Sequence, residues 1–316
     1  MRKIKTAAMI AAMSAACLMV TGCGTKTPEQ KTDQDAESLT PEIPTDARVS
    51  YLGPQGTYTE EAARFFFDES AEFFPKQTVD EAIADAVSGN ADYAVIPQEN
   101  TLGGAVTNYV DALIAEDHVY VIGEVILPIS QTLMGIPGTE LEDIRTVCSH
   151  AQGITQSAAW RKEHLPSAET QEMASTAAAA SYVAETGDKT IAAIAAPAAA
   201  GLYGLEVLAE NVQITDANKT RFYVLSASEP EGTHSRAVFT ATCEANRIDD
   251  IIIEISKAGL ELVTIHDRPE GSQLGSYHYI IETEGSPKVT SEQIAEIKEI
   301  PEVRYLGSFD SLEKRN

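Results

Sequence analysis

The stretch "NKTRFYVL" (residues 218–225) decides how the fold is interpreted, because it is the last strand-like run before a change in composition. Its polar start, Asn218 to Arg221, precedes an apolar run that is typical of a buried strand. A strand so late in the sequence, together with the run that starts at residue 206, allows the chain to cross back to elements formed much earlier. The cation Arg221 has two interpretations here, a surface charge at a strand edge or the anchor of an anionic ligand.

Upstream of this stretch, strand and helix signals alternate from about Val49. Thr57 precedes a run with helical periodicity and Glu60 follows three residues later, which is the spacing of a helix capping box. A second series of strands and helices begins near Thr139. Such a βαβ succession implies parallel sheets that are covered on both faces. We therefore expect an α/β fold of two lobes around a cleft, with ligands bound where strand ends and helix N-termini converge.

Downstream, the segment "SASEPEGTHS" (226–235) breaks the composition, and a compact unit follows. Its strand and helix signals have the order βαββαβ over residues 236–309, which is the ferredoxin-like arrangement. The chain has 316 residues, which is long enough to bury more than one core. The boundaries that we expect are a two-lobed body at 48–227 and a C-terminal unit at 235–312.

The N-terminus has the features of an export signal. Three basic residues precede an apolar stretch (7–20) that is too short for a lasting membrane span. The sequence "VTGC" (20–23) follows and resembles a bacterial lipobox, in which the cysteine is lipidated. We expect a signal peptide at 1–22 and a lipidated Cys23 that begins a polar, disordered tether at 23–47. The protein would then be a cell-membrane lipoprotein on the extracytoplasmic side, with an ordinary signal peptide as the alternative.

The composition is acidic, with 23 Lys and Arg against 48 Asp and Glu and a formal net charge of −25. Loss of residues 1–22, which hold three basic and no acidic residues, would lower it by three to −28. Binding to nucleic acid is therefore disfavoured, and an acidic ligand needs a locally built positive site. We interpret Cys148 and Cys243 as small buried apolar residues. The histidines show no metal-ligand spacing, so no metal is implied.

Four short segments place Ser, Thr, Asn or Gly at the expected strand-to-helix junctions, where free backbone N–H groups favour an anion. Each segment by itself is most often only a helix cap. The presence of four such segments in one two-lobed body favours the interpretation that they face a common cleft. The segments are "GPQGT" (53–57), "QENTLGG" (98–104), "SHAQG" (149–153) and "STAAAA" (175–180).

Together with "NKTRF" (218–222), these segments resemble the ordered motifs of the prephenate dehydratases. The resemblance covers residues 49–226, and the C-terminal unit resembles the regulatory ACT domain of that family. It implies a periplasmic-binding-protein-II-like body, a ferredoxin-like ACT domain, no cofactor, and a homodimer or homotetramer. It also implies a carbon–oxygen lyase (EC 4.2.1.51). Such an enzyme converts prephenate into phenylpyruvate with loss of CO2 and water, in L-phenylalanine biosynthesis.

The resemblance also implies roles for individual residues. Thr220 matches the catalytic threonine, which hydrogen-bonds the leaving hydroxyl or delivers a proton to it. Arg221 would bind a substrate carboxylate through both arms of its guanidinium, while Phe222, grouped with the substrate-binding residues, is interpreted mainly as packing. The other substrate-binding residues would offer hydroxyl, amide or helix-start N–H groups, and they are Asn100, Thr101, Thr57, Ser149, Gln152, Ser175 and Thr176.

Two residues near the expected cleft keep two interpretations each. Glu99 is an acid–base group or a structural carboxylate that pairs with backbone N–H groups or with Arg221. His150 is an acid–base group or a positioned hydrogen-bond donor. The residue types alone do not separate these roles.

The C-terminal unit departs from the family pattern for binding phenylalanine as a feedback effector. Where the family has Gly-Ala-Leu and Glu-Ser-Arg-Pro segments, this chain has "ANRI" (245–248) and "HDRP" (266–269). Arg268 and Pro269 match the pattern, so they are the expected effector residues. The large side chains of the first segment stand where an amino acid would need room, and this departure argues against inhibition by phenylalanine.

Two other functions are compatible with the same architecture. An arogenate dehydratase would use the same fold and form phenylalanine directly. A solute-binding lipoprotein would share the lipobox, the tether and the two-lobed cleft. The motif at residues 220–222, its partner motifs and the C-terminal unit favour the enzyme, because a binding protein does not need them.

Overall fold

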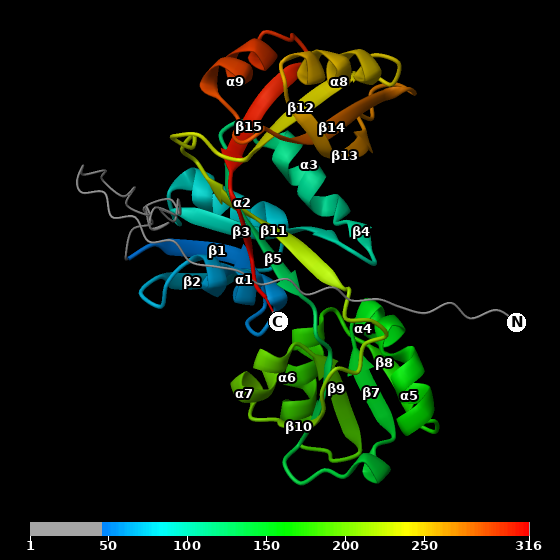
Figure 1. The fold of residues 1–316 in the computed structure, drawn as a ribbon. Helices are drawn as coiled ribbons and strands as arrows, with labels where there is room; N and C mark the ends of the chain where they lie inside the picture. The colour runs from blue at the N-terminus through cyan, green and yellow to red at the C-terminus, as the bar shows by residue number, and fades with distance from the viewer. Residues whose placement is uncertain (1–45, 316) are drawn as a thin grey trace, which may run out of the picture. The chain divides into compact units, whose positions relative to one another are not determined.

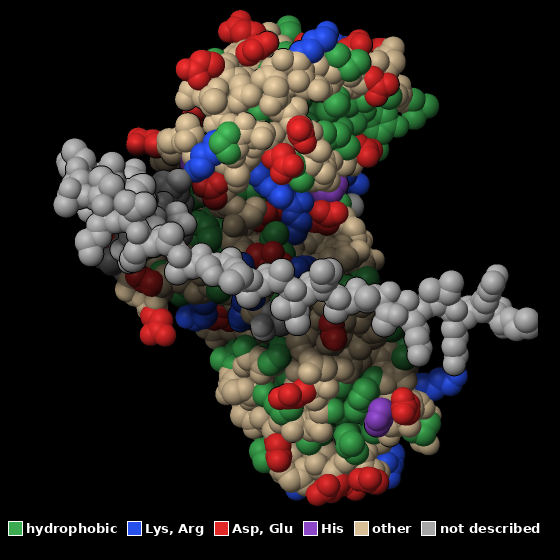
Figure 2. Space-filling model, in the orientation of Figure 1, with side chains coloured by type: hydrophobic (Ala, Val, Ile, Leu, Met, Phe, Trp, Pro, Cys, Tyr) green, Lys and Arg blue, Asp and Glu red, His purple; other side chains and the backbone are tan. Residues whose placement is uncertain are grey.

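The computed structural model describes residues 46–315 (Figure 1), so the expected signal peptide, Cys23 and nearly all of the expected tether lie outside the described residues. Within the described part, no helix is both long and apolar enough to cross a membrane. Acidic side chains are spread over the face of the molecule seen in Figure 2, in keeping with the net charge.

The first lobe is a mixed sheet flanked by helices. Its elements are β1 (Arg48–Leu52), α1 (Tyr58–Phe66), β2 (Glu72–Lys76), α2 (Val79–Ser88), β3 (Tyr93–Asn100), β4 (Gly104–Ala105), α3 (Thr107–Ala115), β5 (Tyr120–Pro128) and β11 (Lys219–Ser226).

The second lobe has a separate five-stranded sheet in the order β10-β6-β9-β7-β8. Its elements are β6 (Thr132–Gly135), a 3-10 turn η1 (Leu141–Asp143), β7 (Thr146–Ser149), α4 (Ala151–Gln156), α5 (Ala158–His164), β8 (Glu169–Glu172), α6 (Thr176–Thr186), β9 (Ile191–Ala195), α7 (Pro197–Tyr203) and β10 (Glu206–Ala209).

The expectation that the stretch at 218–225 returns to the first lobe is confirmed. β11 lies between β3 and β5 and is antiparallel to both. The strand β10 does not return with it, because β10 pairs with β6 in the second sheet. The second lobe also begins earlier than Thr139, since β6 already belongs to it. Each sheet is mixed, because β11 runs antiparallel to β3 and β5 in the first sheet and β6 runs antiparallel to β9 and β10 in the second.

Thr57 and Ser175 cap their helices as expected, but Glu60 does not complete the expected capping box, because its Oε2 accepts from Gly56 N at 2.7 Å and not from Thr57 N. Thr57 Oγ1 accepts a hydrogen bond from Glu60 N at the start of α1, and Ser175 Oγ does the same for Ala178 N at α6. The run "AQGITQSAAWRKEHL" (151–165) has the pattern of one continuous helix, and we expect a single helix there from the sequence, but the chain breaks at Ser157 into α4 and α5. Ser157 Oγ donates to Gly153 O at 2.7 Å, and such a side-chain bond competes with the helix ladder.

The C-terminal unit has the ferredoxin-like topology that the sequence predicts. Its elements are β12 (Arg236–Glu244), α8 (Ile248–Lys257), β13 (Glu261–Pro269), β14 (Ser276–Glu284), α9 (Ser291–Lys298) and β15 (Val303–Phe309), with the sheet order β13-β14-β12-β15. A short strand, β16 (Ser311–Glu313), follows and pairs with β5.

This unit extends the sheet of the first lobe, which the sequence did not indicate. β15 meets β5 where Gly307 lies opposite Val121. Gly307 has a φ of 138°, and a Cβ there would lie 2.1 Å from the carbonyl oxygen of Val121. Only glycine permits this approach. The junction is also apolar, because Leu306 and Phe309 of β15 belong to the same buried cluster as the core of the first lobe.

Both cysteines in the described part of the chain are buried and free. Cys148 lies in the core of the second lobe, and Cys243 lies in the core of the C-terminal unit. The interpretation of both as small buried apolar residues is confirmed.

Candidate active site

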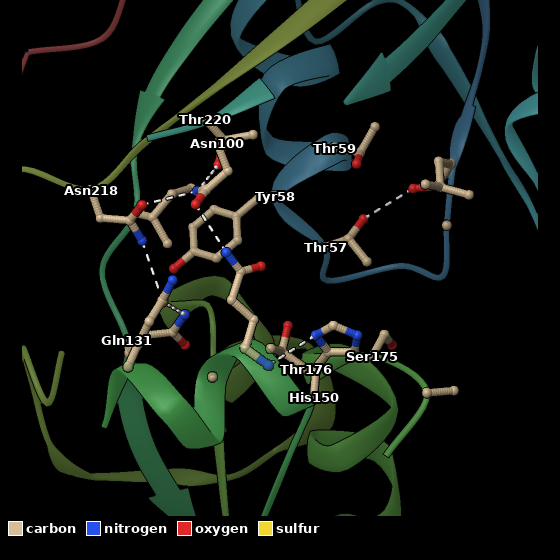
Figure 3. Close-up of a pocket in the computed structure, with 17 residues that line it drawn as sticks. Thr57, Tyr58, Thr59, Asn100, Gln131, His150, Ser175, Thr176, Asn218 and Thr220 are labelled. Atoms are coloured by element: carbon tan, nitrogen blue, oxygen red, sulfur yellow. Dashed lines mark hydrogen bonds between the residues drawn. The ribbon is translucent and has the colours of Figure 1, made fainter. Parts of the chain in front are cut away.

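A pocket of about 250 Å³ lies between the two lobes and is lined by side chains from both (Figure 3). From the first lobe come β3, β11 and the start of α1, and from the second lobe come α4 and the start of α6. Of the residues that the sequence singled out, the pocket brings together Thr57, Asn100, His150, Gln152, Ser175, Thr176 and Thr220.

Asn100 and Thr220 form the centre of the site on the first lobe. They lie opposite each other on the paired strands β3 and β11. Asn100 Nδ2 donates to Thr220 Oγ1 at 2.8 Å and to Asn218 Oδ1 at 2.9 Å. All three side chains are at most 9% exposed, so this hydrogen-bonded group is held in a largely dry environment.

The second lobe reaches the same group through α4. Gln152 Nε2 donates to Asn100 Oδ1 at 2.9 Å, and this bond joins the two lobes across the pocket. His150 is the N-cap of α4, and its Nδ1 accepts from Gln152 N at 3.3 Å. The role of His150 as a cap explains its position in the lining, while its other ring nitrogen has no protein partner within residues 46–315.

The start of α1 forms another wall of the pocket. Thr57, Tyr58 and Thr59 all line it. The Tyr58 hydroxyl donates to the carbonyl oxygen of Ser130, and burial raises the pKa of this phenol above its ordinary value. Tyr58 is therefore neutral at physiological pH and offers a polar but uncharged surface.

Among residues 46–315, the lining contains no Lys, Arg, Asp or Glu, and its ionisable side chains are Tyr58 and His150. An anionic ligand must therefore be held here by neutral donors. Hydroxyl and amide groups are available, together with the free backbone N–H groups at the starts of α1 and α6. Within residues 46–315 no group of three or more His, Cys, Asp or Glu side chains is arranged to hold a metal ion.

The interpretation of Arg221 as the anchor of a substrate carboxylate needs correction. Successive side chains of a strand point to opposite faces, so Arg221 points away from the pocket that Thr220 lines. Its Nε donates to Glu124 Oε1 at 2.6 Å, and its Nη2 donates to both carboxylate oxygens of Glu282 at 2.6 Å. Its Nη1 lies 3.3 Å from Glu99 Oε2. The guanidinium is fully engaged by protein carboxylates.

We call this group the junction cluster, because it joins the first lobe to β14 of the C-terminal unit. It consists of Arg221, Glu99, Glu124, Glu282 and Arg236, whose Nη1 also donates to Glu282. Burial opposes the charge on Arg221, but Glu124 and Glu282 outweigh it and raise the pKa of the guanidinium further. Burial raises the pKa of Glu124, although Arg221 acts in the opposite direction.

The junction cluster also decides between the two interpretations of Glu99. Its carboxylate pairs with Arg221, and its Oε1 lies 3.8 Å from His266 Nε2. Glu99 is not part of the pocket lining, so this geometry corresponds to the structural carboxylate and not to the acid–base group.

Three further expected substrate-binding residues are placed outside the pocket. Ser149 is fully buried, and its Oγ donates to Ile194 O at 2.7 Å. Gly153 packs against this hydroxyl, and a Cβ at Gly153 would lie 2.3 Å from Ser149 Oγ. Thr101 Oγ1 is bound to the backbone of Lys219 instead. Phe222 is buried in the core of the first lobe, as its interpretation as a packing residue requires.

The expected effector residues lie at the junction with α3. Arg268 forms two hydrogen bonds with Asp111 of α3, at 2.7 and 2.8 Å, and Pro269 ends β13. The guanidinium of Arg268 is thus tied to the first lobe in this structure.

Several lining residues were missed by the sequence reasoning. Asn218 lies inside the motif at 218–222 and Tyr58 directly follows the motif at 53–57, but neither received a role. Gln156 follows Gln152 by four residues, and this spacing places both on one helix face, so a helical reading could have found it. Thr59 and Gln131 also line the pocket, and Gln131 lies in a connection between strands, where no local pattern marks a site.

Comparison with known proteins identifies the family. Residues 49–230 match the family model for prephenate dehydratase. A prephenate dehydratase from Amycolatopsis methanolica is 32% identical over 274 residues, which are 83% of this chain and 88% of that protein. The crystal structure of a prephenate dehydratase from Arthrobacter aurescens in complex with L-Phe is 32% identical, has a TM-score of 0.75, and is matched over 84% of this chain and 90% of that one.

A second solved structure, described as GqqA, a novel type of quorum quenching acylase, has a TM-score of 0.74 at 25% identity. The match covers 84% of this chain and 98% of that one. The fold thus also occurs in a protein described by another activity, and the family assignment rests on the matched model and on the more similar relatives. The chain belongs to the prephenate dehydratase family.

Proposed function

We propose that this protein is a prephenate dehydratase, a carbon–oxygen lyase that converts prephenate into phenylpyruvate, CO2 and water. Family membership supports the reaction, and the observation that carries it is the hydrogen-bonded pair Asn100–Thr220 in a pocket between two lobes. The pair presents a buried hydroxyl held by an amide, which suits the orientation of a leaving hydroxyl group.

The reaction needs a few well-placed groups and no cofactor. The bond between the ring and its carboxylate breaks, its electrons form the aromatic ring, and the ring hydroxyl leaves as water after it gains a proton. In our proposal, Thr220 donates a hydrogen bond to the leaving oxygen. The two carboxylates are held by neutral groups: the Ser175 and Thr176 hydroxyls, the Gln152 amide and the N–H groups at the start of α6. A proton that comes from an ionisable side chain of the lining would come from His150, because the Tyr58 hydroxyl already donates its hydrogen to Ser130 O.

The direct test is an assay of the full-length chain, purified in detergent, with prephenate and with arogenate. Phenylpyruvate from prephenate supports the proposal, and phenylalanine formed from arogenate in preference would assign the alternative substrate. Ligand binding without turnover of either compound would indicate a solute-binding protein. Acylase activity in place of both reactions would contradict the proposal. Thr220→Val is the matched control, and its turnover should be strongly reduced.

The C-terminal unit is proposed to be an ACT domain that binds L-phenylalanine as an effector and supports a homodimer or homotetramer. The relative from Arthrobacter aurescens, solved with L-Phe, supports this proposal. The departures at "ANRI" and the hydrogen bonds of Arg268 to Asp111 argue for weak binding. A thermal shift and loss of turnover with L-phenylalanine, but not with L-alanine, would support the effector role, and light scattering measures the oligomer.

The sequence before the described residues supports a further proposal, that Cys23 is lipidated and anchors the protein on the extracytoplasmic side of the cell membrane. Labelling with palmitate should be lost in Cys23→Ala. Labelling that persists, or a protein that remains unprocessed in the cytoplasm, would contradict this location.

A further inference from the structure

The orientation of the Asn100 side-chain amide is set by the backbone around it. Its Oδ1 accepts from the N–H groups of Leu102 and Gly103, both at 3.0 Å, and its Nδ2 lies 3.3 Å from the carbonyl oxygen of Lys219. Exchanging the two ends would place an NH2 group against two N–H donors and an oxygen against a carbonyl. Only one orientation satisfies these groups.

This orientation determines which way the Thr220 hydroxyl acts. Asn100 presents an N–H to Thr220 Oγ1 at 2.8 Å, so Thr220 is the acceptor in that bond. A hydroxyl has one hydrogen to give, and within residues 46–315 no group accepts the hydrogen of Thr220. Because Thr220 lines the pocket, its hydrogen is available to an oxygen atom of a bound ligand.

The same amide chain continues behind Asn100 into the interior. Asn218 Oδ1 accepts from Asn100 Nδ2, so Asn218 Nδ2 is its donor end, and it donates to Gln156 Oε1 at 3.3 Å. Gln131 Nε2 donates to the same Gln156 oxygen at 3.2 Å. The chain ends at Gln131, whose Oε1 has no partner within residues 46–315. The orientation of the amide groups in this chain of hydrogen bonds is therefore set by Asn100.

Asn218 and Gln156 are only 1% and 5% exposed, so solvent competes little for these bonds. Asn218 Oδ1 and Thr220 Oγ1 both accept from Asn100 Nδ2. Gln156, from the second lobe, accepts from Asn218 Nδ2 and so holds Asn218 in place. The chain therefore links the approach of the two lobes to the position of one hydroxyl group.

We propose that Asn218 and Gln156 are positioning residues for the dehydration, because they hold Asn100 so that the Thr220 hydroxyl donates its hydrogen to the leaving oxygen of the substrate. The inference rests on the proposed dehydratase function. It states that Asn218 acts only through Thr220 and makes no contribution of its own to the binding of the substrate carboxylates.

The test is a double-mutant cycle on the full-length chain with Asn218→Leu and Thr220→Val. Asn218→Leu should lower kcat for prephenate about tenfold to a hundredfold, since small displacements of a catalytic group have such effects. It should leave KM within about threefold, because binding of the ground state does not use it. In the Thr220→Val background the same change should have almost no further effect on kcat.

Matched variants separate positioning from folding. Asn90→Leu removes an exposed amide from the turn between α2 and β3, away from the pocket, and it should have wild-type kinetics. Gln156→Met should lower kcat less than Asn218→Leu does, because it lies one link further from Thr220. If Asn218→Leu does not fold, as thermal unfolding would show, Gln156→Met in both Thr220 backgrounds carries the same test.

The outcomes distinguish this inference from the proposed function. A wild-type protein that turns over neither prephenate nor arogenate removes the proposed function itself. An active wild type with equal losses of kcat from Asn218→Leu in both backgrounds overturns the positioning role. A rise in KM with unchanged kcat would also overturn it, since Asn218 would then bind the substrate directly.

Discussion

The two faces of the strands β3 and β11 have opposite chemistry. On the face toward the pocket, Asn100 and Thr220 form a neutral hydrogen-bonded pair. On the other face, Glu99 and Arg221, which are their immediate neighbours in sequence, belong to the charged junction cluster. The comparison teaches that a motif of adjacent residues on a strand serves two regions at once, because side chains alternate between faces.

The junction cluster and the pocket also differ in the charge of their side chains. Glu124 and Glu282 are fully buried, and their charges are tolerated only because Arg221 and Arg236 neutralise them. In the part of the chain that the structure describes, no Asp, Glu, Lys or Arg lines the pocket, so a dianionic substrate would meet no fixed like charge from these residues. Charge is thus concentrated at the junction and kept away from the proposed chemistry.

Arg221→Met should have the largest effect, on stability and not on substrate binding. Removing the guanidinium leaves buried carboxylates uncompensated, which costs about 3–5 kcal/mol of the free energy of unfolding. Urea unfolding measures this loss. The matched control is Arg48→Met, because the Arg48–Asp92 pair is 42% and 40% exposed and is worth at most about 1 kcal/mol. A large rise in KM at unchanged stability would restore the carboxylate-anchor interpretation.

Thr220→Val should produce the next largest effect, a fall in kcat of about 10²–10³-fold, because a hydrogen-bond donor to the reacting oxygen is lost. Steady-state kinetics with prephenate measures it. Thr220→Ser keeps the hydroxyl and should retain most of the activity. Wild-type turnover in Thr220→Val would refute the role of this residue.

Ser149 lies outside the pocket and Ser175 lines it, so removal of the hydroxyl should affect the two variants differently. Ser149→Ala removes a buried hydrogen bond to Ile194 O and should cost about 1 kcal/mol of stability, with KM unchanged. Ser175→Ala removes a hydroxyl from the pocket lining and should raise KM for prephenate, with some loss of stability as well because Ser175 caps α6. Thermal unfolding and kinetics of both variants check this, and an effect of Ser149→Ala confined to KM would contradict the placement of Ser149.

The smallest predicted effect is a pH dependence that comes from His266, beside the junction cluster. Burial lowers the pKa of His266, although Glu99 acts in the opposite direction. As pH falls through the ordinary histidine range, the unfolded chain binds a proton before the folded protein does, so stability is lost. The free energy of unfolding between pH 7.5 and 5 should therefore depend less on pH in His266→Gln than in the wild type. A steeper dependence in the variant would contradict the sign.

Much of the architecture was predictable because its signals are local. Thr57 and Ser175 cap helices as their positions before apolar-periodic runs indicate. The order βαββαβ in the C-terminal unit follows from alternating and helical periodicities, and the topology confirms it. The break at Ser157 escaped prediction, because a serine in a helical pattern does not show which carbonyl its hydroxyl will bind.

The candidate site was predictable only in part. Thr220, Asn100, Gln152, Ser175 and Thr176 lie in sequence motifs, and the structure brings them to one pocket. The substrate-binding roles first given to Arg221, Ser149 and Thr101 depended on which way each side chain points. That direction is set by strand pairing and packing, which adjacency in the sequence does not reveal.

Local pattern and motif order were enough to predict the family, the order of the elements and the position of Thr220 within a strand. The place of Arg221 in the junction cluster follows only from the folded chain, since its partners Glu124 and Glu282 lie 97 and 61 residues away in the sequence. The same is true of the contact between Gln131 and Gln156 beside Asn218. Such long-range contacts follow from the free energy of burying and pairing polar groups in the whole fold, and no local pattern encodes them.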